Sequence, residues 1–370
     1  MSQKIKVCHF TSIHPSGDTR IFVKECTTLA QAGFEVFLLA VDTKSEIKNG
    51  VSIINIPGAG QSRISRMTAT AKRVYRAALD LDARIYHFHD PELIPFALRL
   101  VKAGKKVIYD VHEDIPRQIL AKHYIPAPFR KLTSFIVEKI EDRAVAKFSW
   151  IVTATPFIRD RFRKLNKHVT EVCNFPLQGE LTSQMPYHER PKQLCYVGTI
   201  TRERGIIELI TAMNTLPYCL HLCGEFYPLS LREEAMALPG WKQVTEHGFA
   251  SREVVNSVLE SSRIGMVTLH PIINYIDAYP VKMFEYMMAG IPVIASDIPL
   301  WKQIVDKTGA GVCVDPLNPE AIRNAIIRLM EDETTSIRMG EAGRLAVMLK
   351  YNWQQEETKL IDIYKTLAAE

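Results

Sequence analysis

The chain has 370 residues, of which 47% are hydrophobic and 24% are charged. This length exceeds what one hydrophobic core usually supports, so we expect two α/β domains rather than one, and the composition does not indicate disorder. The formal net charge of +5 comes from 46 basic and 41 acidic residues. This excess is too small and too dispersed to predict nucleic-acid binding, but it suits anionic ligands or acidic lipid headgroups.

Cysteine usage and hydropathy indicate a cytoplasmic protein. The seven cysteines are odd in number and lie mostly in apolar runs, which is typical of buried thiols in a reducing compartment. Cys219 and Cys223 lack the second, closely spaced pair that a zinc site would use, so a structural role is favoured. No segment reaches the about 18 apolar residues of a membrane span. We expect a cytoplasmic protein that is soluble or lies peripherally on the inner face of the cytoplasmic membrane.

Short β-rich runs alternate with helical patterns in the first half of the chain. Helices are predicted at 21–32, 91–103 and 129–147. This alternation is typical of a parallel sheet covered by helices on both faces, and such sheets bind ligands beyond the carboxyl ends of their strands. The predicted strands are 6–10, 35–41, 51–56, 84–88, 106–111 and 150–154.

Polar clusters accompany three of these strands, with the sequences TSIHPSGDTRIF, HFHDPEL and YDVHED. A histidine on a buried strand is more often a satisfied core residue than a catalyst. Three such clusters, each at the carboxyl end of a strand, nevertheless predict that this edge of the first sheet carries functional side chains.

A polar, proline-bearing segment without periodicity separates two halves of the chain. Beyond it the α/β pattern restarts with QLCYVG and continues through LHLCG, VIAS and GVCV. No fixed-period repeat stands out, which disfavours a solenoid. We predict an α/β protein of two Rossmann-like domains facing each other across a cleft, with a first domain at 1–175, a linker at 176–192, a second domain at 193–351, and a last helix at 352–370 packing on the first domain.

The segment DAYPVKMFEYMMAGIPVIAS, at 277–296, carries most of the functional information. Tyr279 and Pro280 precede a helical run, whose free N–H groups and dipole can receive a diphosphate. Lys282 and Glu285 share one face of that helix, so a cation for phosphate stands near a carboxylate that can accept from ribose hydroxyls. A packed helix with ordinary surface charges is the alternative, but the whole arrangement favours a nucleoside-diphosphate site.

This segment resembles the signature of the family 4 (group 1) glycosyltransferases, which are retaining enzymes of the GT-B fold. Their pattern has two acidic residues eight apart, the second in a helix that ends at a small residue before an apolar strand. Here the second acid falls on Glu285 and the small residue on Gly290, while the first falls on Asp277, where relatives commonly have glutamate. The resemblance implies that Glu285 holds the ribose hydroxyls and that Asp277 faces the transferred sugar.

A second block, LCYVGTITRERGIIELITAM, is similar to the family's strand, glycine turn and basic pair before a helix expected to begin near residue 204. Gly198 would let the backbone approach the ligand, and the guanidinium forks of Arg202 and Arg204 suit phosphate oxygens. The residues assigned to donor binding are Gly17, Gly198, Arg202, Arg204, Glu225, Tyr279, Pro280, Val281, Lys282 and Glu285.

The resemblance makes the first domain the acceptor-binding domain and the second the donor domain. It places the histidine that approaches the donor sugar at His112, while Asp18 and Arg20 replace the glycine-rich loop of many relatives. The implied catalytic residues are His112, Arg204, Asp277 and Glu285, and the implied acceptor-side residues are Asp18, Arg20, His89, Asp90 and Glu113.

A segment at 117–148 combines basic residues with aromatic and aliphatic ones at helical spacing. It has the pattern of a helix that rests on an acidic membrane carrying a lipid-linked acceptor. An ordinary amphipathic helix covering the sheet is the alternative.

The chemistry is expected to need neither a metal nor a cofactor. No Asp-any-Asp triplet follows a strand, and the chain has neither a P-loop lysine nor a Gly-x-Ser-x-Gly motif. Arg202, Arg204, Lys282 and the helix N-terminus would instead stabilise the leaving diphosphate. The expected reaction is retaining transfer of a sugar from a nucleoside-diphosphate sugar to a glycan or lipid-linked acceptor, and the family resemblance adds bacterial surface polysaccharide such as capsule or O-antigen.

Two other functions fit the same residues. A GT-B sugar-nucleotide epimerase would change the donor without any acceptor, and a non-catalytic nucleotide-sugar-binding protein would bind without turnover. A nicotinamide dehydrogenase is disfavoured because no G-x-G-x-x-G follows a strand.

Overall fold

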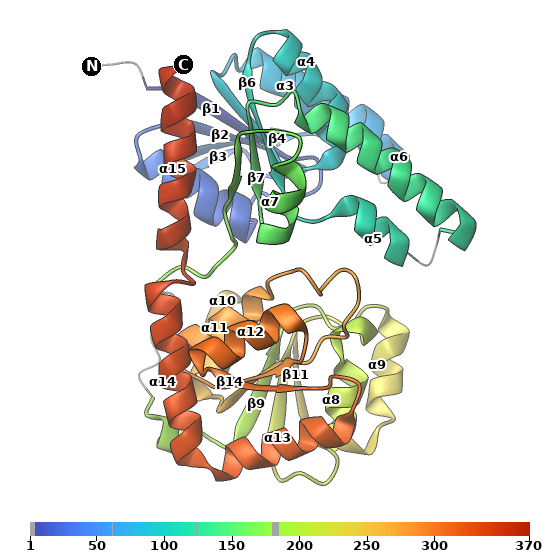
Figure 1. Ribbon diagram of the computed structural model, residues 1–370, viewed down its shortest axis with the longest axis vertical. Helices are drawn as coiled ribbons and strands as arrows, with labels where there is room; N and C mark the ends of the chain where they lie inside the picture. The colour runs from blue at the N-terminus through green and yellow to red at the C-terminus, as the bar shows by residue number, and fades with distance from the viewer. Residues whose placement is uncertain (1–3, 61, 123–124, 180–184) are drawn as a thin grey trace. The chain divides into compact units, whose positions relative to one another are not determined.

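The computed structural model describes residues 4–60, 62–122, 125–179 and 185–370, which fall into two compact units. Unit 1 combines the chain up to Asn174 with Trp353–Glu370, and unit 2 is Phe175–Asn352. Each unit is a largely parallel sheet with helices packed against it (Figure 1). The predicted class of two Rossmann-like α/β domains is confirmed. The described part of the segment 176–192, expected as a linker, belongs to unit 2.

Unit 1 contains an eight-stranded sheet with the order β3-β4-β2-β1-β5-β6-β7-β8. Neighbouring strands are parallel except β3 and β4, which pair antiparallel at one edge. Four predicted strands have the predicted bounds, β5 and β7 are each one residue shorter, and the short β3 and β8 were not predicted. The strands are β1 (Lys6–Phe10), β2 (Glu35–Val41), β3 (Glu46–Lys48), β4 (Val51–Ile56), β5 (Ile85–Phe88), β6 (Lys106–Val111), β7 (Trp150–Thr153) and β8 (Val169–Glu171).

The helix predicted at 21–32 begins as a π-helix, η1 (Thr19–Cys26), and continues as α1 (Thr27–Gln31). Asp18 starts it, because its Oδ1 accepts from the N–H groups of Arg20 and Ile21 at 2.8 and 2.9 Å. The other helices before residue 174 are α2 (Arg63–Ser65), η2 (Arg66–Thr70), α3 (Ala71–Asp80), η3 (Pro91–Leu93), α4 (Ile94–Lys102), α5 (Ile115–Ala121), α6 (Ala127–Val145) and α7 (Pro156–Phe162).

The last helix, α15 (Trp353–Ala369), packs on unit 1 (Figure 1). Trp353 Nε1 donates to Thr28 Oγ1 at 2.9 Å, and Glu356 Oε2 accepts from the N–H of Cys173 at 2.8 Å. Its Tyr364 is fully buried. The end of the chain therefore completes the core of the domain that the beginning of the chain builds.

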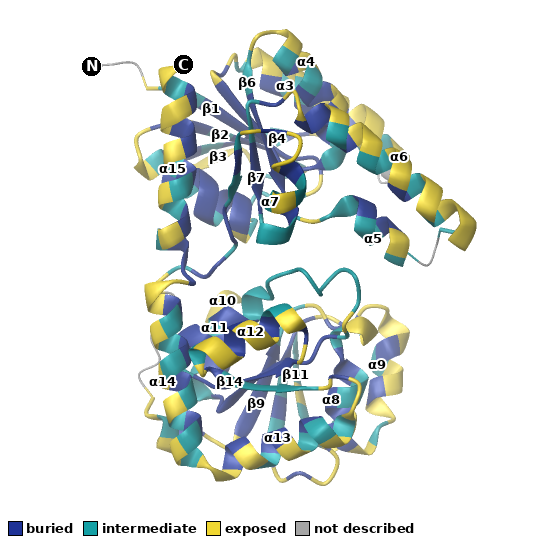
Figure 2. Cartoon of the chain, viewed as in Figure 1, coloured by how far each residue is buried: buried dark blue, intermediate teal, exposed yellow. Residues whose placement is uncertain are grey.

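Unit 2 contains a six-stranded, wholly parallel sheet with the order β11-β10-β9-β12-β13-β14. Its central strands are mostly dark blue in Figure 2 and the edge strand β14 is teal, whereas its helices turn exposed residues outward. The strands are β9 (Gln193–Val197), β10 (Cys219–Cys223), β11 (Val244–Gly248), β12 (Ile264–Val267), β13 (Val293–Ser296) and β14 (Gly311–Val314). The helices are η4 (Tyr187–Glu189), η5 (Arg202–Arg204), α8 (Ile206–Ala212), α9 (Leu229–Met236), η6 (Pro239–Gln243), α10 (Arg252–Ser261), α11 (Val281–Met288), α12 (Pro299–Thr308), α13 (Pro319–Glu331) and α14 (Glu333–Leu349).

One helix boundary differs from the prediction. The helix expected to start near Arg204 starts at Ile206, because Gly205 takes a left-handed φ of +73° and separates η5 from α8. A Cβ at Gly205 would lie 1.8 Å from the carbonyl oxygen of Thr268. The turn therefore brings Arg204 back over the end of the sheet.

Candidate active site

The carboxyl ends of β9 and β12 meet where the strand order of unit 2 reverses, and parallel sheets bind ligands at such points. Gly198 follows β9 with a φ of +111°, which favours glycine. A Cβ on Gly224, just after β10, would lie 2.1 Å from the carbonyl oxygen of Gly198. The two strand ends thus pack backbone against backbone at Gly198 and Gly224.

Lys282 lies in the first turn of α11, and its stem is partly exposed while its Nζ is shielded from solvent. Within the described residues no atom accepts a hydrogen bond from Nζ, which lies 3.6 Å from the centroid of the Tyr196 ring. Burial lowers the pKa of Lys282 well below its usual value, and the charge of Arg204 lowers it further. Such a buried cation costs folding free energy until an anion joins it.

Arg204 completes a pair of cations beside this glycine. Its Nη1 donates to the carbonyl oxygen of Thr199 at 3.2 Å. Burial opposes its charge, but Tyr196 and Tyr275 outweigh burial and raise the pKa of Arg204. A Cβ placed on Gly198 would lie 3.4 Å from Arg204 Nη1 and 3.6 Å from Lys282 Nζ. The structure therefore brings Gly198, Arg204 and Lys282 close together.

Glu285 lies one turn beyond Lys282 on the same helix. Its Oε1 accepts a hydrogen bond from Arg252 Nη1, at the start of α10, at 2.8 Å. This pair sets the position of the carboxylate and leaves Oε2 as a further acceptor. A carboxylate one turn from Lys282 can accept hydrogen bonds from hydroxyl groups of a ligand whose phosphate lies at Lys282.

Small residues allow α11 to approach the sheet and α14 closely. The ring of Tyr286 lies over Gly265 of β12, where a Cβ would come within 2.3 Å of the ring, and Tyr286 Oη accepts from the N–H of Val197 at 2.9 Å. On the other side, a Cβ on Gly340 of α14 would lie 2.2 Å from the carbonyl oxygen of Gly290. These contacts fix where Lys282 and Glu285 are presented.

The other residues assigned to the donor lie near this cluster or apart from it. Asp277 is half-buried in the turn before α11, and Val281 begins that helix directly after Pro280, which precedes it as predicted. The Tyr279 ring lies 5.6 Å from that of Phe175, which is an apolar contact. Two further residues have exposed side chains, namely Arg202, which pairs with Glu234 of α9, and Glu225.

Unit 1 has its own polar centre, at the carboxyl ends of β1, β5 and β6. Asp110 Oδ1 accepts from Arg20 Nη2 at 2.7 Å, and Asp110 Oδ2 accepts from Arg20 Nε at 3.0 Å and contacts His112 Nε2 at 2.7 Å. Burial opposes ionisation of Asp110, but Arg20 and His112 hold its pKa well below its usual range. Arg20, assigned to the acceptor, is buried and also donates to the carbonyl oxygen of Val172 at 2.7 Å.

Two carboxylates, Asp90 and Asp18, anchor the loop after β1. Asp90 is buried and accepts from Thr11 Oγ1 at 2.7 Å and from the N–H of Ser12 at 2.6 Å. His14 lies 3.3 Å from Asp90 and 3.6 Å from Asp18, and these carboxylates raise its pKa against the effect of burial. The loop is therefore held in place by hydrogen bonds to Asp90 and by the contacts of His14 with the two carboxylates.

The remaining assigned residues of unit 1 differ in exposure. Glu113 is exposed and accepts from Gln118, and a Cβ on Gly17 would meet nothing within 4 Å. His89 is buried, with its Nδ1 3.2 Å from Asp110. The side chains of His112 and Asp18 are partly exposed, at 18% and 25%.

Sequence reasoning missed several residues that hold these sites. Tyr196 and Arg252 in unit 2, and Asp110 and Glu25 in unit 1, were not singled out. Tyr196 and Asp110 could have been found, because each is a polar residue within an apolar strand run and a buried polar group needs a hydrogen-bond partner. Arg252 and Glu25 carry no such signal, because their partners are distant in the sequence.

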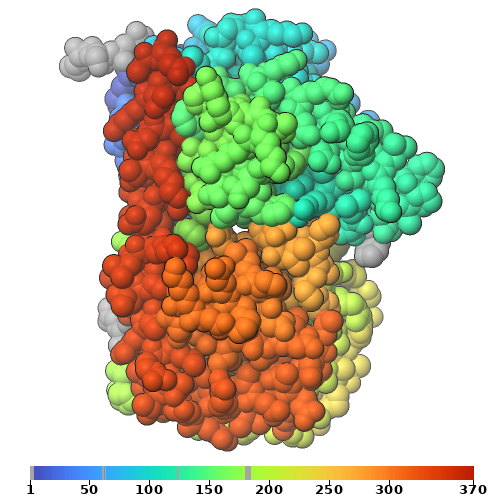
Figure 3. All heavy atoms as spheres, in the orientation of Figure 1, coloured from blue at the N-terminus to red at the C-terminus, as the bar shows by residue number. Residues whose placement is uncertain are grey.

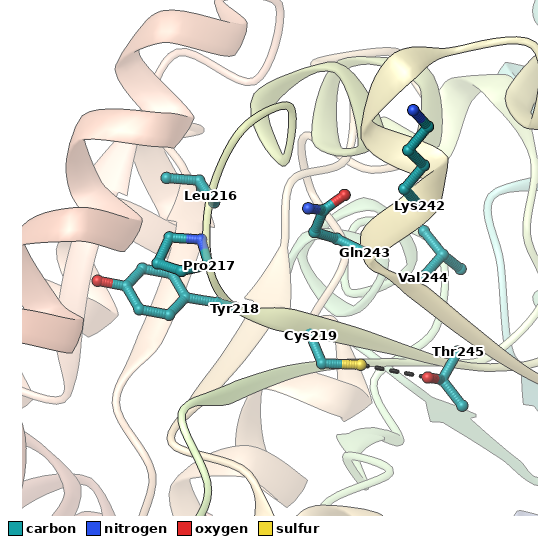
Figure 4. A pocket seen from close by; sticks show the side chains of 8 residues that line it. All are labelled: Leu216, Pro217, Tyr218, Cys219, Lys242, Gln243, Val244 and Thr245. Atoms are coloured by element: carbon teal, nitrogen blue, oxygen red, sulfur yellow. Dashed lines mark hydrogen bonds between the residues drawn. The ribbon is translucent and has the colours of Figure 1, made fainter.

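Figure 4 shows a pocket at the opposite end of the unit 2 strands. It lies at the amino-terminal starts of β10 and β11, away from the strand ends that carry Lys282. Cys219 Sγ lies 3.2 Å from Thr245 Oγ1 there. The lining residues are Leu216, Pro217, Tyr218, Cys219, Lys242, Gln243, Val244 and Thr245.

Both units match known protein families. Residues 16–175 match the model of Glycosyltransferase Family 4, and residues 180–346 match that of glycosyl transferases group 1. The phosphatidyl-myo-inositol mannosyltransferase of Mycobacterium leprae is 21% identical and is aligned over 98% of this chain and 96% of its own. The alpha-D-kanosaminyltransferase of Streptomyces kanamyceticus is 22% identical, over 65% of this chain and 66% of its own.

Solved structures share the fold at low sequence identity. Sucrose-phosphate synthase from Thermosynechococcus elongatus superposes with a TM-score of 0.79 at 18% identity, over 99% of this chain and 100% of that one. HepE of Anabaena, solved in complex with UDP-glucose, gives a TM-score of 0.73 at 12% identity, over 99% and 100% of the two chains. The fold is that of the GT-B enzymes. The chain belongs to the family 4 (group 1) glycosyltransferases and is a glycosyltransferase.

Proposed function

We propose that this enzyme transfers a sugar from a nucleoside-diphosphate sugar with retention of the anomeric configuration, and that the diphosphate leaves without the help of a metal. The observation that carries the proposal is the shielded amino group of Lys282, which has no hydrogen-bond acceptor in the described chain and lies beside Arg204. Two cations and the start of α11 around a glycine make a site for a dianionic group.

The chemistry follows from where charge develops. When the bond between the anomeric carbon and the diphosphate oxygen breaks, the electron pair stays on the diphosphate. The acceptor's hydroxyl oxygen forms the new bond to the anomeric carbon, and its proton passes to the departing diphosphate. Lys282, Arg204 and the N–H groups at the start of α11 then stabilise an oxygen that grows more negative, and one such group typically contributes about 10²–10³ in rate. Glu285, held by Arg252, accepts from the ribose hydroxyls. His112, held by Asp110, is the residue that we assign to the transferred sugar.

Relatives support the donor and acceptor classes. HepE was solved with UDP and with UDP-glucose, and another similar structure, WaaG, is described as a glycosyltransferase involved in lipopolysaccharide biosynthesis. The mycobacterial relatives are named for mannosyl transfer to phosphatidyl-myo-inositol. We therefore propose a glycan or lipid-linked acceptor and a role in bacterial surface polysaccharide.

The outer face of α6 supports peripheral contact with a membrane. The helix projects from unit 1 (Figure 3), and four apolar side chains spaced along one stripe are 47–59% exposed, namely Phe129, Leu132, Ile136 and Ile140. Lys139 and Arg143 border this stripe. Apolar residues flanked by basic ones suit a leaflet with anionic lipids. None of the described helices is long and apolar enough to cross a membrane.

The donor site is tested by two substitutions. Arg204→Ala and Glu285→Ala should each reduce transfer severely while the fold is retained, whereas Arg232→Ala, which removes an exposed guanidinium paired with Glu246, should not. A thermal-shift screen of sugar nucleotides finds the donor first, since a ligand at about 100 times its dissociation constant adds about 2.7 kcal/mol. Near-normal turnover in both alanine variants would reject the assignment.

Product analysis tests the remaining parts of the proposal. NMR of the product of an α-linked donor should show an α-linkage, and added Mg²⁺ or Mn²⁺ should leave the rate unchanged. Donor incubated without acceptor should keep its sugar unaltered, which separates transfer from epimerisation. Leu132→Ser with Ile136→Ser should weaken sedimentation with anionic vesicles, while Leu349→Ser, at an exposed position of α14, should not.

A further inference from the structure

Three imidazoles and a carboxylate converge in the core of unit 1, on the sheet face that η1 and α15 cover. His9 and His87 are register partners on β1 and β5, and His89 lies two residues further along on the same face. Glu25 of η1 reaches them from above the sheet. All four residues are 0–3% exposed, and one potential ligand atom of each lies within 4.8 Å of those of the others.

Each imidazole uses one ring nitrogen on an oxygen outside this group. Tyr364 Oη lies 2.8 Å from His9 Nε2 and 2.7 Å from His87 Nδ1, and Asp110 Oδ2 lies 3.2 Å from His89 Nδ1. The other nitrogens, His9 Nδ1, His87 Nε2 and His89 Nε2, are the ones left for the interior of the group. Histidines that ligate metals are oriented in this way, with the outer nitrogen on an oxygen.

The interior of the group is not satisfied by hydrogen bonds alone. Among the described residues His87 Nε2 has no hydrogen-bond partner, and the carboxyl group of Glu25 interacts with two charged neighbours, Asp110 and Arg20, whose Nε lies 3.1 Å from Oε1. A buried polar atom without a partner costs about 1–3 kcal/mol. His9 Nδ1 and His89 Nε2 share a hydrogen bond at 3.1 Å in this ion-free structure, and this separation is close to the about 3.3 Å between two nitrogens of tetrahedral zinc with bonds near 2.05 Å.

We propose that His9, Glu25, His87 and His89 bind one divalent zinc ion. Three imidazole nitrogens and one carboxylate are ligands that zinc prefers, and four protein ligands make a closed, structural site. The ion would join β1, β5 and η1, and through Tyr364 it would also order α15. It is distinct from the diphosphate site of unit 2 and takes no part in bond breaking there.

The neighbouring set of His89, Asp110 and His112 also has metal-ligand spacing, but it is the weaker candidate. Both oxygens of Asp110 already accept from the guanidinium of Arg20, at 2.7 and 3.0 Å. A permanent cation at that place neutralises the carboxylate and repels a second cation. Glu25 makes one contact with the same guanidinium, from Arg20 Nε to its Oε1 at 3.1 Å, so its charge is less fully neutralised than that of Asp110. Among the described residues His87 Nε2 has no hydrogen-bond partner, so the ion belongs on the side of Glu25 and His87.

Metal analysis of the full-length protein tests the proposal. Protein made in zinc-supplemented medium and gel-filtered should carry one zinc per chain, and protein made with Co²⁺ instead should show the intense visible absorption of tetrahedral cobalt. His87→Gln and Glu25→Gln should each lower the zinc content at least tenfold. His221→Gln, which alters a histidine of unit 2 paired with His247, should leave the zinc content unchanged.

Two results would overturn the assignment of zinc to this group. Wild-type protein with less than about 0.1 zinc per chain, together with no cobalt spectrum and no gain in Tm when it is refolded with Zn²⁺, excludes the site. Equal zinc content in wild type, His87→Gln and Glu25→Gln would mean that the metal is adventitious. If either variant fails to fold, the cobalt spectrum and refolding of the wild-type protein still decide.

Discussion

Lys282 is a residue at which stability and activity should oppose each other. Lys282→Met removes a shielded cation that lacks a hydrogen-bond acceptor in the described structure, so the free energy of unfolding of the ligand-free protein should rise by about 1–3 kcal/mol. The same change should lower kcat by about 10²–10³, because the leaving diphosphate loses a charge partner. Denaturant unfolding and steady-state kinetics measure the two effects. Lys302→Met, at an exposed position of α12, is the matched control, and a destabilised but fully active Lys282→Met enzyme would contradict the expectation.

The titration of Lys282 leads to a second prediction at the residue scale. Burial lowers its pKa below the unfolded value of about 10.4, so between the two pKa values the native protein binds fewer protons than the unfolded chain. Ligand-free stability should therefore rise with pH across that window. A bound diphosphate favours the charged amine, so UDP binding should take up a proton and weaken as pH rises through the same window.

Calorimetry in buffers of different ionisation enthalpy measures this proton uptake directly. Lys282→Met should bind UDP more weakly and without the uptake. Equal uptake in wild type and variant would assign the proton to another group.

At the scale of elements, α11 depends on a close backbone approach. A Cβ on Gly340 would lie 2.2 Å from the carbonyl oxygen of Gly290. Alanine normally favours a helix over glycine by about 0.5–1 kcal/mol, but here the clash with backbone should prevail. Gly340→Ala should lower the free energy of unfolding by about 1–3 kcal/mol and weaken UDP binding by displacing α11. Leu345→Ala, on the exposed side of α14, should do neither, and a stabilised Gly340→Ala protein would refute the argument.

Local elements could be predicted from the sequence where their pattern is self-contained. The strands β1, β2, β4 and β6 and the start of α11 at Val281 follow from apolar runs and from Pro280. The bounds of η1 did not follow, since a π-helix has no distinct sequence pattern, and the exposed three-residue β3 is too short for alternation to appear. The predicted start of α8 at Arg204 was wrong, because Gly205 adopts a left-handed conformation and the helix begins only at Ile206.

The candidate site, too, could be predicted from the sequence only where its residues belong to one local pattern. Lys282 and Glu285 could be paired because helical spacing puts them on one face. Arg252, which holds Glu285, and Arg20, which holds Asp110, could not, because those partners are 33 and 90 residues apart and only the folded sheet brings them together. Long-range ion pairs of this kind are set by tertiary packing and leave no periodic trace in the sequence.

At the scale of the whole molecule, the chain leaves unit 1 at Asn174, builds unit 2, and returns at Trp353. The donor cluster lies within unit 2, whereas α15 supplies Trp353 and Tyr364 to the core of unit 1. A chain that stops at Asn352 should therefore lose transfer and become protease-sensitive before residue 174, because apolar surface and buried hydrogen bonds of unit 1 are uncovered.

The same truncated chain should still bind UDP with nearly the affinity of the full chain, since Gly198, Arg204, Lys282 and Glu285 all remain. Calorimetry with UDP and limited proteolysis with mass mapping measure the two effects side by side. The double substitution Asp362→Ala with Thr366→Ala, on the same helix, is the control that keeps the Trp353 and Tyr364 contacts, and it should leave both transfer and protection intact. If UDP binding disappeared together with protection of unit 1, the donor site would depend on unit 1, and its assignment to unit 2 alone would be wrong.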